Sequence, residues 1–125
     1  MLEDSIVLQE GYAQKQSSGL VKKFQSRYFV LSGHYLRYYE NKDSNDRNEQ
    51  PKGVVDLNDV RTVAVADDDL ITIVMKESER QILIKASSAN SAVVWRDALA
   101  QVMAALMENA SQDRDVGSSA TSKDF

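Results

Sequence analysis

The sequence predicts a mainly β domain of seven strands followed by one α-helix, and three observations support this prediction. The chain has 125 residues, a length that suits a single domain. Short runs rich in β-branched and aromatic residues, separated by turn residues, follow one another from position 10 to position 86. From position 89 onward the large apolar residues change to a helical spacing.

The first three predicted strands are Glu10–Gln16, Gln25–Ser32 and His34–Glu40. The polar segment 17–19 favours a turn after the first strand, and Gly33 separates the second strand from the third. Residues 41–52 are rich in Asn and Asp and contain the chain's one proline, so they are predicted to form an exposed loop.

The four remaining predicted strands are Gly53–Leu57, Arg61–Ala66, Leu70–Met75 and Arg80–Lys85. Alternating isoleucines support the last two, because successive side chains of a strand point to opposite faces. The three consecutive aspartates at 67–69 are predicted to form a solvated turn. Neighbouring side chains in an extended chain diverge, so these carboxylates are not expected to converge on a metal ion.

A helix is predicted over Ala89–Glu108. Its large apolar residues recur at steps of four, three and four, which places them on one helical face: Trp95, Leu99, Val102 and Leu106. Ser87 or Ser88 is the expected N-cap. Trp95 is the expected core anchor, and Met103 and Met107 are expected to pack beside it. Residues 109–125 lose the apolar periodicity and are predicted to be a disordered tail or linker after a folded domain over residues 8–108.

Catalysis, metal binding and cofactor binding have little support in the sequence. The chain has no cysteine, a single histidine (His34), and no GxSxG, HExxH or P-loop motif, so it is predicted not to be an enzyme and to need no cofactor. Residues 1–10 carry acidic residues in place of the basic and apolar stretches of a signal peptide, and no apolar run reaches the roughly 20 residues that span a bilayer. We therefore expect a cytoplasmic protein, and nothing in the sequence requires more than a monomer.

Charge is unevenly distributed along the chain. The segment Gly11–Tyr39 contains five basic residues and no acidic one, whereas the whole chain has 15 basic and 19 acidic residues. The net charge of −4 argues against indiscriminate binding to nucleic acid. A basic segment in an acidic chain indicates either a local anion site or a solvated basic face.

A candidate anion site lies near the start of the second predicted strand. Residues two apart in a strand share a face, so Lys23, Gln25 and Arg27 are expected to project together. If the first two strands pair as a hairpin, Lys15 lies close to this row. Converging lysine and arginine side chains bind phosphate groups through charge-assisted hydrogen bonds.

Six segments, taken together, point to one family. They are EGYAQK at 10–15, KFQSRYFVL at 23–31, LRYY at 36–39, QPKGVVDL at 50–57, IKA at 84–86, and the helix tryptophan Trp95. In this order and spacing they closely resemble a pleckstrin homology (PH) domain. The resemblance implies a seven-stranded barrel of two near-orthogonal antiparallel sheets, capped at one end by the C-terminal helix and open at the other.

The resemblance also implies a ligand site at the open end. In members that bind phosphoinositides, a lysine ending the first strand and a basic–x–Arg motif opening the second hold the phosphates, and Lys15 and Arg27 match these positions. In members selective for lipids with a phosphate at the third ring position, a tyrosine of the third strand and a basic residue before the fourth also contribute. Tyr38 and Lys52 occupy these two positions of the family pattern.

This sequence departs from the family pattern at Gln25, which replaces the first basic residue of basic–x–Arg. A neutral hydrogen bond contributes less than a charged one, so weaker binding is expected unless lysines of the loop compensate. Two functions therefore remain open. One is a membrane-targeting module for phosphoinositide lipids or inositol phosphates that uses Lys15, Lys22, Lys23, Arg27, Tyr38 and Lys52. The other is a protein–protein interaction module of PH fold with weak or no specific lipid binding, whose basic face is incidental. For Tyr38, packing within its strand is the alternative to a ligand contact, and for Lys52 it is a solvated loop end.

Overall fold

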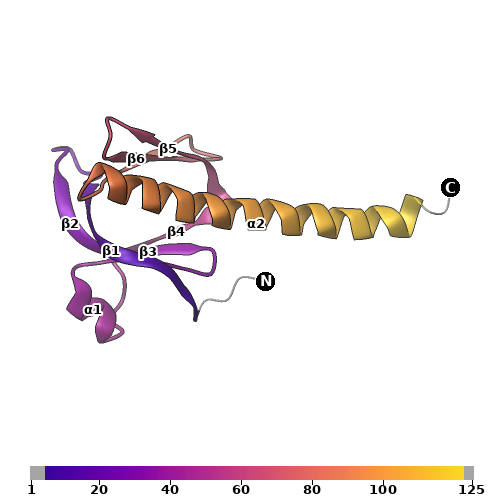
Figure 1. Cartoon of the computed structure of the whole chain (residues 1–125), viewed down its shortest axis with the longest axis horizontal. Helices are drawn as coiled ribbons and strands as arrows, with labels where there is room; N and C mark the ends of the chain where they lie inside the picture. The colour runs from indigo at the N-terminus through magenta and orange to yellow at the C-terminus, as the bar shows by residue number, and fades with distance from the viewer. Residues whose placement is uncertain (1–4, 123–125) are drawn as a thin grey trace.

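The computed structural model describes the backbone of residues 5–122 and the side chains of residues 5–110. Seven antiparallel strands are followed by a long C-terminal helix, as predicted (Figure 1). The strands are β1 (Val7–Gln16), β2 (Phe24–Ser32), β3 (Tyr35–Tyr39), β4 (Gly53–Asp56), β5 (Val60–Ala66), β6 (Leu70–Met75) and β7 (Gln81–Lys85). They begin and end within a few residues of the predicted positions.

The strands form one sheet in the order β4-β3-β2-β1-β7-β6-β5, in which β1 joins two halves. Its pairing with β2 extends over nearly the whole of both strands. Its pairing with β7 is limited to two residue pairs, Gln14 with Lys85 and Lys15 with Ile84. The junction between the halves is therefore at the C-terminal end of β1, where the basic segment predicted to bind anions also lies.

The hydrophobic core lies between the inner faces of the two halves and the first turns of the helix α2 (Ala89–Ser122). Trp95 is only 4% exposed, and its ring meets Phe29 of β2 edge-on with the ring centroids 6.3 Å apart. Ala92, Leu99 and Val102 belong to the same core cluster. The prediction that Trp95 anchors the helix to the sheet is thus confirmed.

The helix α2 begins as predicted but extends further. The Ser88 hydroxyl accepts a hydrogen bond from the Ser91 N–H at 3.0 Å, as an N-cap does. The helix continues to Ser122, because its backbone hydrogen bonds form within the segment and need no apolar face. Its C-terminal part projects beyond the strands (Figure 1). Met107 is accordingly 71% exposed, and the prediction that it packs was wrong.

The division into a domain over residues 8–108 and a tail over 109–125 remains a prediction. The backbone of residues 109–122 is helical, which differs from the irregular chain expected there. Residues 123–125 lie outside the described part of the chain.

The segment after β3 also differs from the exposed loop that its composition predicted. It contains a short helix, α1 (Lys42–Asp46), in which the Asn41 side chain accepts a hydrogen bond from the Ser44 N–H at 2.9 Å. The Lys42 N–H donates to the Tyr12 hydroxyl at 2.9 Å and thereby ties α1 to β1. Polar capping residues favour loops and helix ends alike, so composition did not distinguish them. A single 3₁₀ turn, η1 (Leu57–Asp59), follows β4.

Candidate functional site

The inner face of the β1–β2 hairpin changes from apolar to basic toward the end of β1. Lys15 lies opposite Gln25, and the buried Ala13 lies opposite Arg27. Residues directly opposite each other in a sheet point to the same face, so Lys15, Gln25 and Arg27 share the face that forms the core farther along the hairpin. Strand pairing alone brings the two predicted phosphate ligands together at this end of the sheet.

Tyr38 of β3 forms the floor between this hairpin and β4. Its ring centroid lies 5.6 Å from that of Phe29, and the Lys15 Nζ lies 5.2 Å from the Tyr38 centroid. Its hydroxyl lies over Gly53, where a Cβ atom would overlap it. Tyr38 therefore packs against the core and also faces Lys15, so both roles considered for it are structurally compatible.

These side chains surround a hollow of about 250 Å³ at the end of the sheet. Four of the six predicted site residues line it, namely Lys15, Arg27, Tyr38 and Lys52. The other lining residues are neutral: Gln16, Ser17, Ser18, Gly19 and Gln25. Among the described residues that line this hollow there is no carboxylate. The hollow is therefore suited to an anion.

Lys22 and Lys23 do not line the hollow. They are exposed on the β1–β2 loop, which is closed by hydrogen bonds of Ser17. The Ser17 N–H donates to the Lys23 carbonyl at 2.8 Å, and the Ser17 hydroxyl donates to the Val21 carbonyl at 2.8 Å. In this conformation the two lysines add positive potential near the hollow without reaching into it.

Burial and, after it, repulsion between cations shape the electrostatics of the hollow. Burial, followed by the charges of Arg80 and Arg27, lowers the pKa of Lys15 from its ordinary value. Arg27 itself is held in place, because its guanidinium donates to the Gln25 Oε1 at 3.2 Å and to the Ser26 carbonyl at 2.7 Å. An anion placed between Lys15 and Arg27 would relieve this repulsion.

Among the residues whose side chains are described, Lys52 is the cation of the hollow that has a carboxylate partner. Its Nζ lies 3.3 Å from the Glu40 Oε1, and both side chains are about half exposed. Its backbone N–H donates to the Tyr38 carbonyl at 2.7 Å, which positions Lys52 at the rim. Because exposed ion pairs contribute little free energy, a bound anion can draw Lys52 away from Glu40 at small cost.

Arg80 is a neighbour of the site that the sequence did not single out. It precedes β7 directly and is close enough to Lys15 to lower the pKa of that amine. Strand order would supply the signal, because in the antiparallel pair of β1 and β7 the start of one strand lies toward the end of the other. Strand order, however, is a long-range property that the local pattern does not contain.

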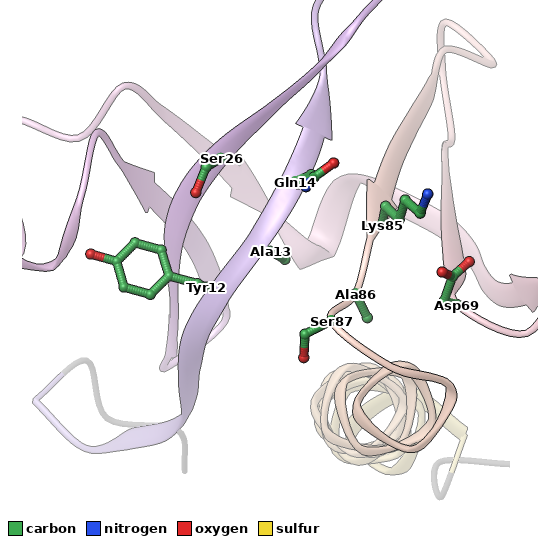
Figure 2. Close-up of a pocket in the computed structure, with 8 residues that line it drawn as sticks. All are labelled: Tyr12, Ala13, Gln14, Ser26, Asp69, Lys85, Ala86 and Ser87. Atoms are coloured by element: carbon green, nitrogen blue, oxygen red, sulfur yellow. The ribbon is translucent and has the colours of Figure 1, made fainter.

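A second hollow, of about 290 Å³, lies along the seam between β1 and β7. Figure 2 shows Gln14 and Lys85 on the neighbouring strands, with the start of α2, seen along the helix axis, below them. Its described lining residues include one basic side chain, Lys85, and one acidic side chain, Asp69. Since the two charges offset each other, this hollow is less suited to a multiply charged anion than the one around Lys15 and Arg27.

The described residues show no cluster of three or more His, Asp or Glu side chains suited to holding a metal ion. Among the helices that the structure describes, none combines the length and the apolar character needed to cross a membrane.

Comparison with solved structures gives the same fold. The C-terminal PH domain of pleckstrin, crystallised with the inositol pentakisphosphate D-myo-Ins(1,2,3,4,5)P5, is 21% identical with a TM-score of 0.63, and the match covers 78% of this chain and 98% of that chain. The PH domain of human oxysterol-binding protein-related protein 11 is 24% identical with a TM-score of 0.59 and 76% coverage of both chains. A further pleckstrin homology domain solved in solution is 18% identical with a TM-score of 0.65, with 80% and 88% of the two chains covered.

No curated protein sequence matches the chain significantly. The PH domain family, in contrast, matches residues 7–104, which is more than half of the chain. This match agrees with the seven antiparallel strands, the C-terminal helix and the buried Trp95 described above. The chain belongs to the PH domain family.

Proposed function

We propose that this PH domain binds the phosphorylated headgroup of a phosphoinositide in the hollow around Lys15 and Arg27, and that it recruits its host protein to membranes that display this lipid. One observation carries the proposal: three cations, Lys15, Arg27 and Lys52, line one hollow whose other described lining residues are neutral. The Arg27 fork suits bidentate contact with one phosphate, and the two lysines supply mobile charges for others.

The ligand class has independent support from structural neighbours. The C-terminal PH domain of pleckstrin was crystallised with two different inositol pentakisphosphates, at 21% and 22% identity to this chain. Such ligands carry several phosphates around a small ring. A pocket with a neutral lining and cations on different sides complements this arrangement of charges. In this proposal Lys22 and Lys23 contribute attraction from the loop, and Tyr38 with Lys52 forms the side of the site toward β4.

The decisive experiment is an NMR titration of the isotope-labelled chain with soluble inositol phosphates that differ in phosphate position. We expect saturable shifts centred on Lys15, Arg27 and Tyr38, with a preference among isomers. Arg27→Ala should abolish the saturable shifts while the spectrum stays dispersed as in a folded protein. The matched control is Arg96→Ala, which removes the same charge from the exposed surface of α2.

Two results would overturn the proposal. Equal, weak shifts for every isomer that disappear with added salt would identify the basic face as a generic surface, because screening removes such contacts first. Retained isomer-specific binding in Arg27→Ala would place the ligand elsewhere. The first result would favour the alternative, a protein–protein interaction module.

A further inference from the structure

The strand β5 ends the sheet on one side and, in the described part of the chain, pairs only with β6. The other end of the sheet is β4, which has four residues, whereas β5 has seven. The outer edge of such a strand presents backbone N–H and C=O groups that can pair with a further strand. The outer edge of β5 is therefore the longer of the two places where this sheet can be extended.

The middle of β5 lacks the features that usually prevent pairing between sheet edges. Residues 62–66, which are Thr, Val, Ala, Val and Ala, include no charged residue and no proline. Natural edges are commonly protected by charged side chains, by proline or by a bulge. In β5 an irregularity is confined to the start of the strand, between Val60 and Thr62. From Thr62 onward the pairing with β6 is regular, and Thr62, Ala64 and Ala66 are exposed.

Opposite charges flank this uncharged stretch. Arg61 precedes it, and the exposed Asp67 and Asp68 follow it in the turn to β6. Beside Arg61 lies a hollow of about 300 Å³ between α2 and the start of β5, and the charged residues among its described lining are Arg61 and Lys76. The start of the outer edge is thus positive, and its end is negative.

We propose that two copies of this chain associate through β5, with the two strands antiparallel and Ala64 of one copy opposite Ala64 of the other. In this register Val63 lies opposite Val65, and Arg61 of each copy lies beside Asp67 of the other at the ends of the shared ladder. Each copy contributes the same surface, as a two-fold symmetric contact requires. Opposite charges at neighbouring cross-strand positions stabilise such a pair. The contact does not depend on the headgroup site.

The charge pattern favours a second copy over an unrelated strand. An unrelated strand would need an acidic end beside Arg61 and a basic end beside Asp67. A second β5 that runs in the opposite direction supplies both ends from its own sequence. The same arrangement brings the aspartates of one copy to the hollow of the other, where the charged lining residues are basic.

Arg61 is able to contact Asp67 of the other copy. Its Nη2 donates to the Lys76 carbonyl at 3.0 Å and lies 3.0 Å from the Glu79 Oε2. The guanidinium group has further N–H donors besides those of Nη2. The ion pair with Glu79 is also well exposed, so it contributes little free energy and can be exchanged at small cost.

The first test is sedimentation equilibrium of the unmodified chain from micromolar to millimolar concentrations. One short strand from each copy makes a small interface, so we expect a weak, reversible dimer. Ala64→Lys places two like charges opposite each other at the symmetry axis and should weaken the dimer about tenfold or more. The matched control, Ala104→Lys, adds the same charge at an exposed alanine of α2 and should leave the dimer unchanged.

Charge reversal tests the register. Arg61→Asp and Asp67→Arg each place like charges at both ends of the dimer, so each variant alone should be monomeric. An equimolar mixture should form a heterodimer, because each copy then meets the opposite charge at both ends. Rescue by mixing also separates a lost contact from a lost fold. If one variant is isotope-labelled, the unlabelled one should shift the NMR signals of residues 62–66.

Three results would overturn the proposal. If the unmodified chain stays monomeric at all these concentrations, the edge of β5 does not bind a second copy. If Ala64→Lys leaves a dimer intact, another surface forms that dimer. If the two charge-reversal variants stay monomeric when mixed, the antiparallel register centred on Ala64 is wrong.

Discussion

At the scale of single residues, the affinity of the candidate site for an anion depends on how many cations line it and on how their side chains are oriented. Gln25 lies between Lys15 and Arg27 on the inner face and accepts a hydrogen bond from the Arg27 guanidinium at 3.2 Å. It therefore orients Arg27, whereas a lysine at this position would add a charge for the ligand. Comparison of the sequence with the family pattern shows only that Gln25 lacks a positive charge. The structure shows in addition that Gln25 orients Arg27.

We predict that Gln25→Lys binds inositol phosphates about tenfold more tightly, because a charged hydrogen bond is stronger than a neutral one. Isothermal titration calorimetry at near-physiological salt measures the change. Gln101→Lys adds the same charge on the exposed surface of α2 and should leave the affinity unaltered. Unchanged or weaker binding by Gln25→Lys would mean that positioning Arg27 matters more than the added charge.

A second residue-scale prediction concerns the close approach of Tyr38 to Gly53. Gly53→Ala would force the tyrosine ring to move, and such overpacking costs about 1–3 kcal/mol of the free energy of unfolding. Urea denaturation measures this loss. In Gly19→Ala the added Cβ meets open space, so its stability should stay near that of the unmodified chain. Equal stability of the two variants would contradict the packing role of Tyr38.

At the scale of elements, polar contacts tie the turns to the strands. In the β2–β3 turn, the His34 Nδ1 lies 2.8 Å from the Asp56 Oδ1, and the same oxygen accepts from the Asn58 N–H at 3.0 Å and caps η1. Burial opposes ionisation of Asp56, but the hydrogen bonds from Asn58 and His34 outweigh it and lower the pKa of Asp56. The contact between the β2–β3 turn and η1 is thus strongest when Asp56 is ionised.

The corresponding prediction is a pH dependence of stability on the acid side. Because the folded-state pKa of Asp56 is lowered, its contribution is fully present above the ordinary value of 3.8 and is lost as the pH falls through the folded value. Asp56→Ala should cost about 1 kcal/mol of the free energy of unfolding at neutral pH. This difference should shrink below about pH 4, as thermal melts over a pH series would show. A difference that is constant with pH would contradict the assignment.

At the scale of the whole molecule, two halves of a sheet are held together by few strand contacts and one helix. Only two residue pairs join β1 to β7, so the packing of α2 against the shared core contributes much of the cohesion. The hollow lies at the end of the sheet where β1 ends, next to this junction. Tyr38 both lines the hollow and packs against the core, so the binding part of the fold shares a residue with the part that provides stability.

Trp95→Ala tests how much the helix contributes to this cohesion. We expect a loss of about 3–5 kcal/mol, typical of a large buried aromatic residue, in the free energy of unfolding measured with urea. Val93→Ala, at a residue 38% exposed on the same helix, should cost far less. If Trp95→Ala lowers the free energy of unfolding by less than about 1 kcal/mol, the two halves of the sheet stay packed together without the helix anchor.

What the sequence by itself determined is local: seven strands from their alternation, the helix from its spacing, Trp95 as its anchor, and Lys15 and Arg27 as members of one basic face. These follow from side-chain periodicity within a segment. Only the tertiary structure decided that the charge of Arg80 acts on Lys15, that Lys22 and Lys23 stay outside the hollow, that α1 folds against β1 through Tyr12, and that α2 continues past Glu108. The first three depend on strand order, loop closure or contacts between segments distant in the chain, which no local pattern encodes. The continuation of α2 rests on backbone hydrogen bonds within the helix, which apolar periodicity does not report.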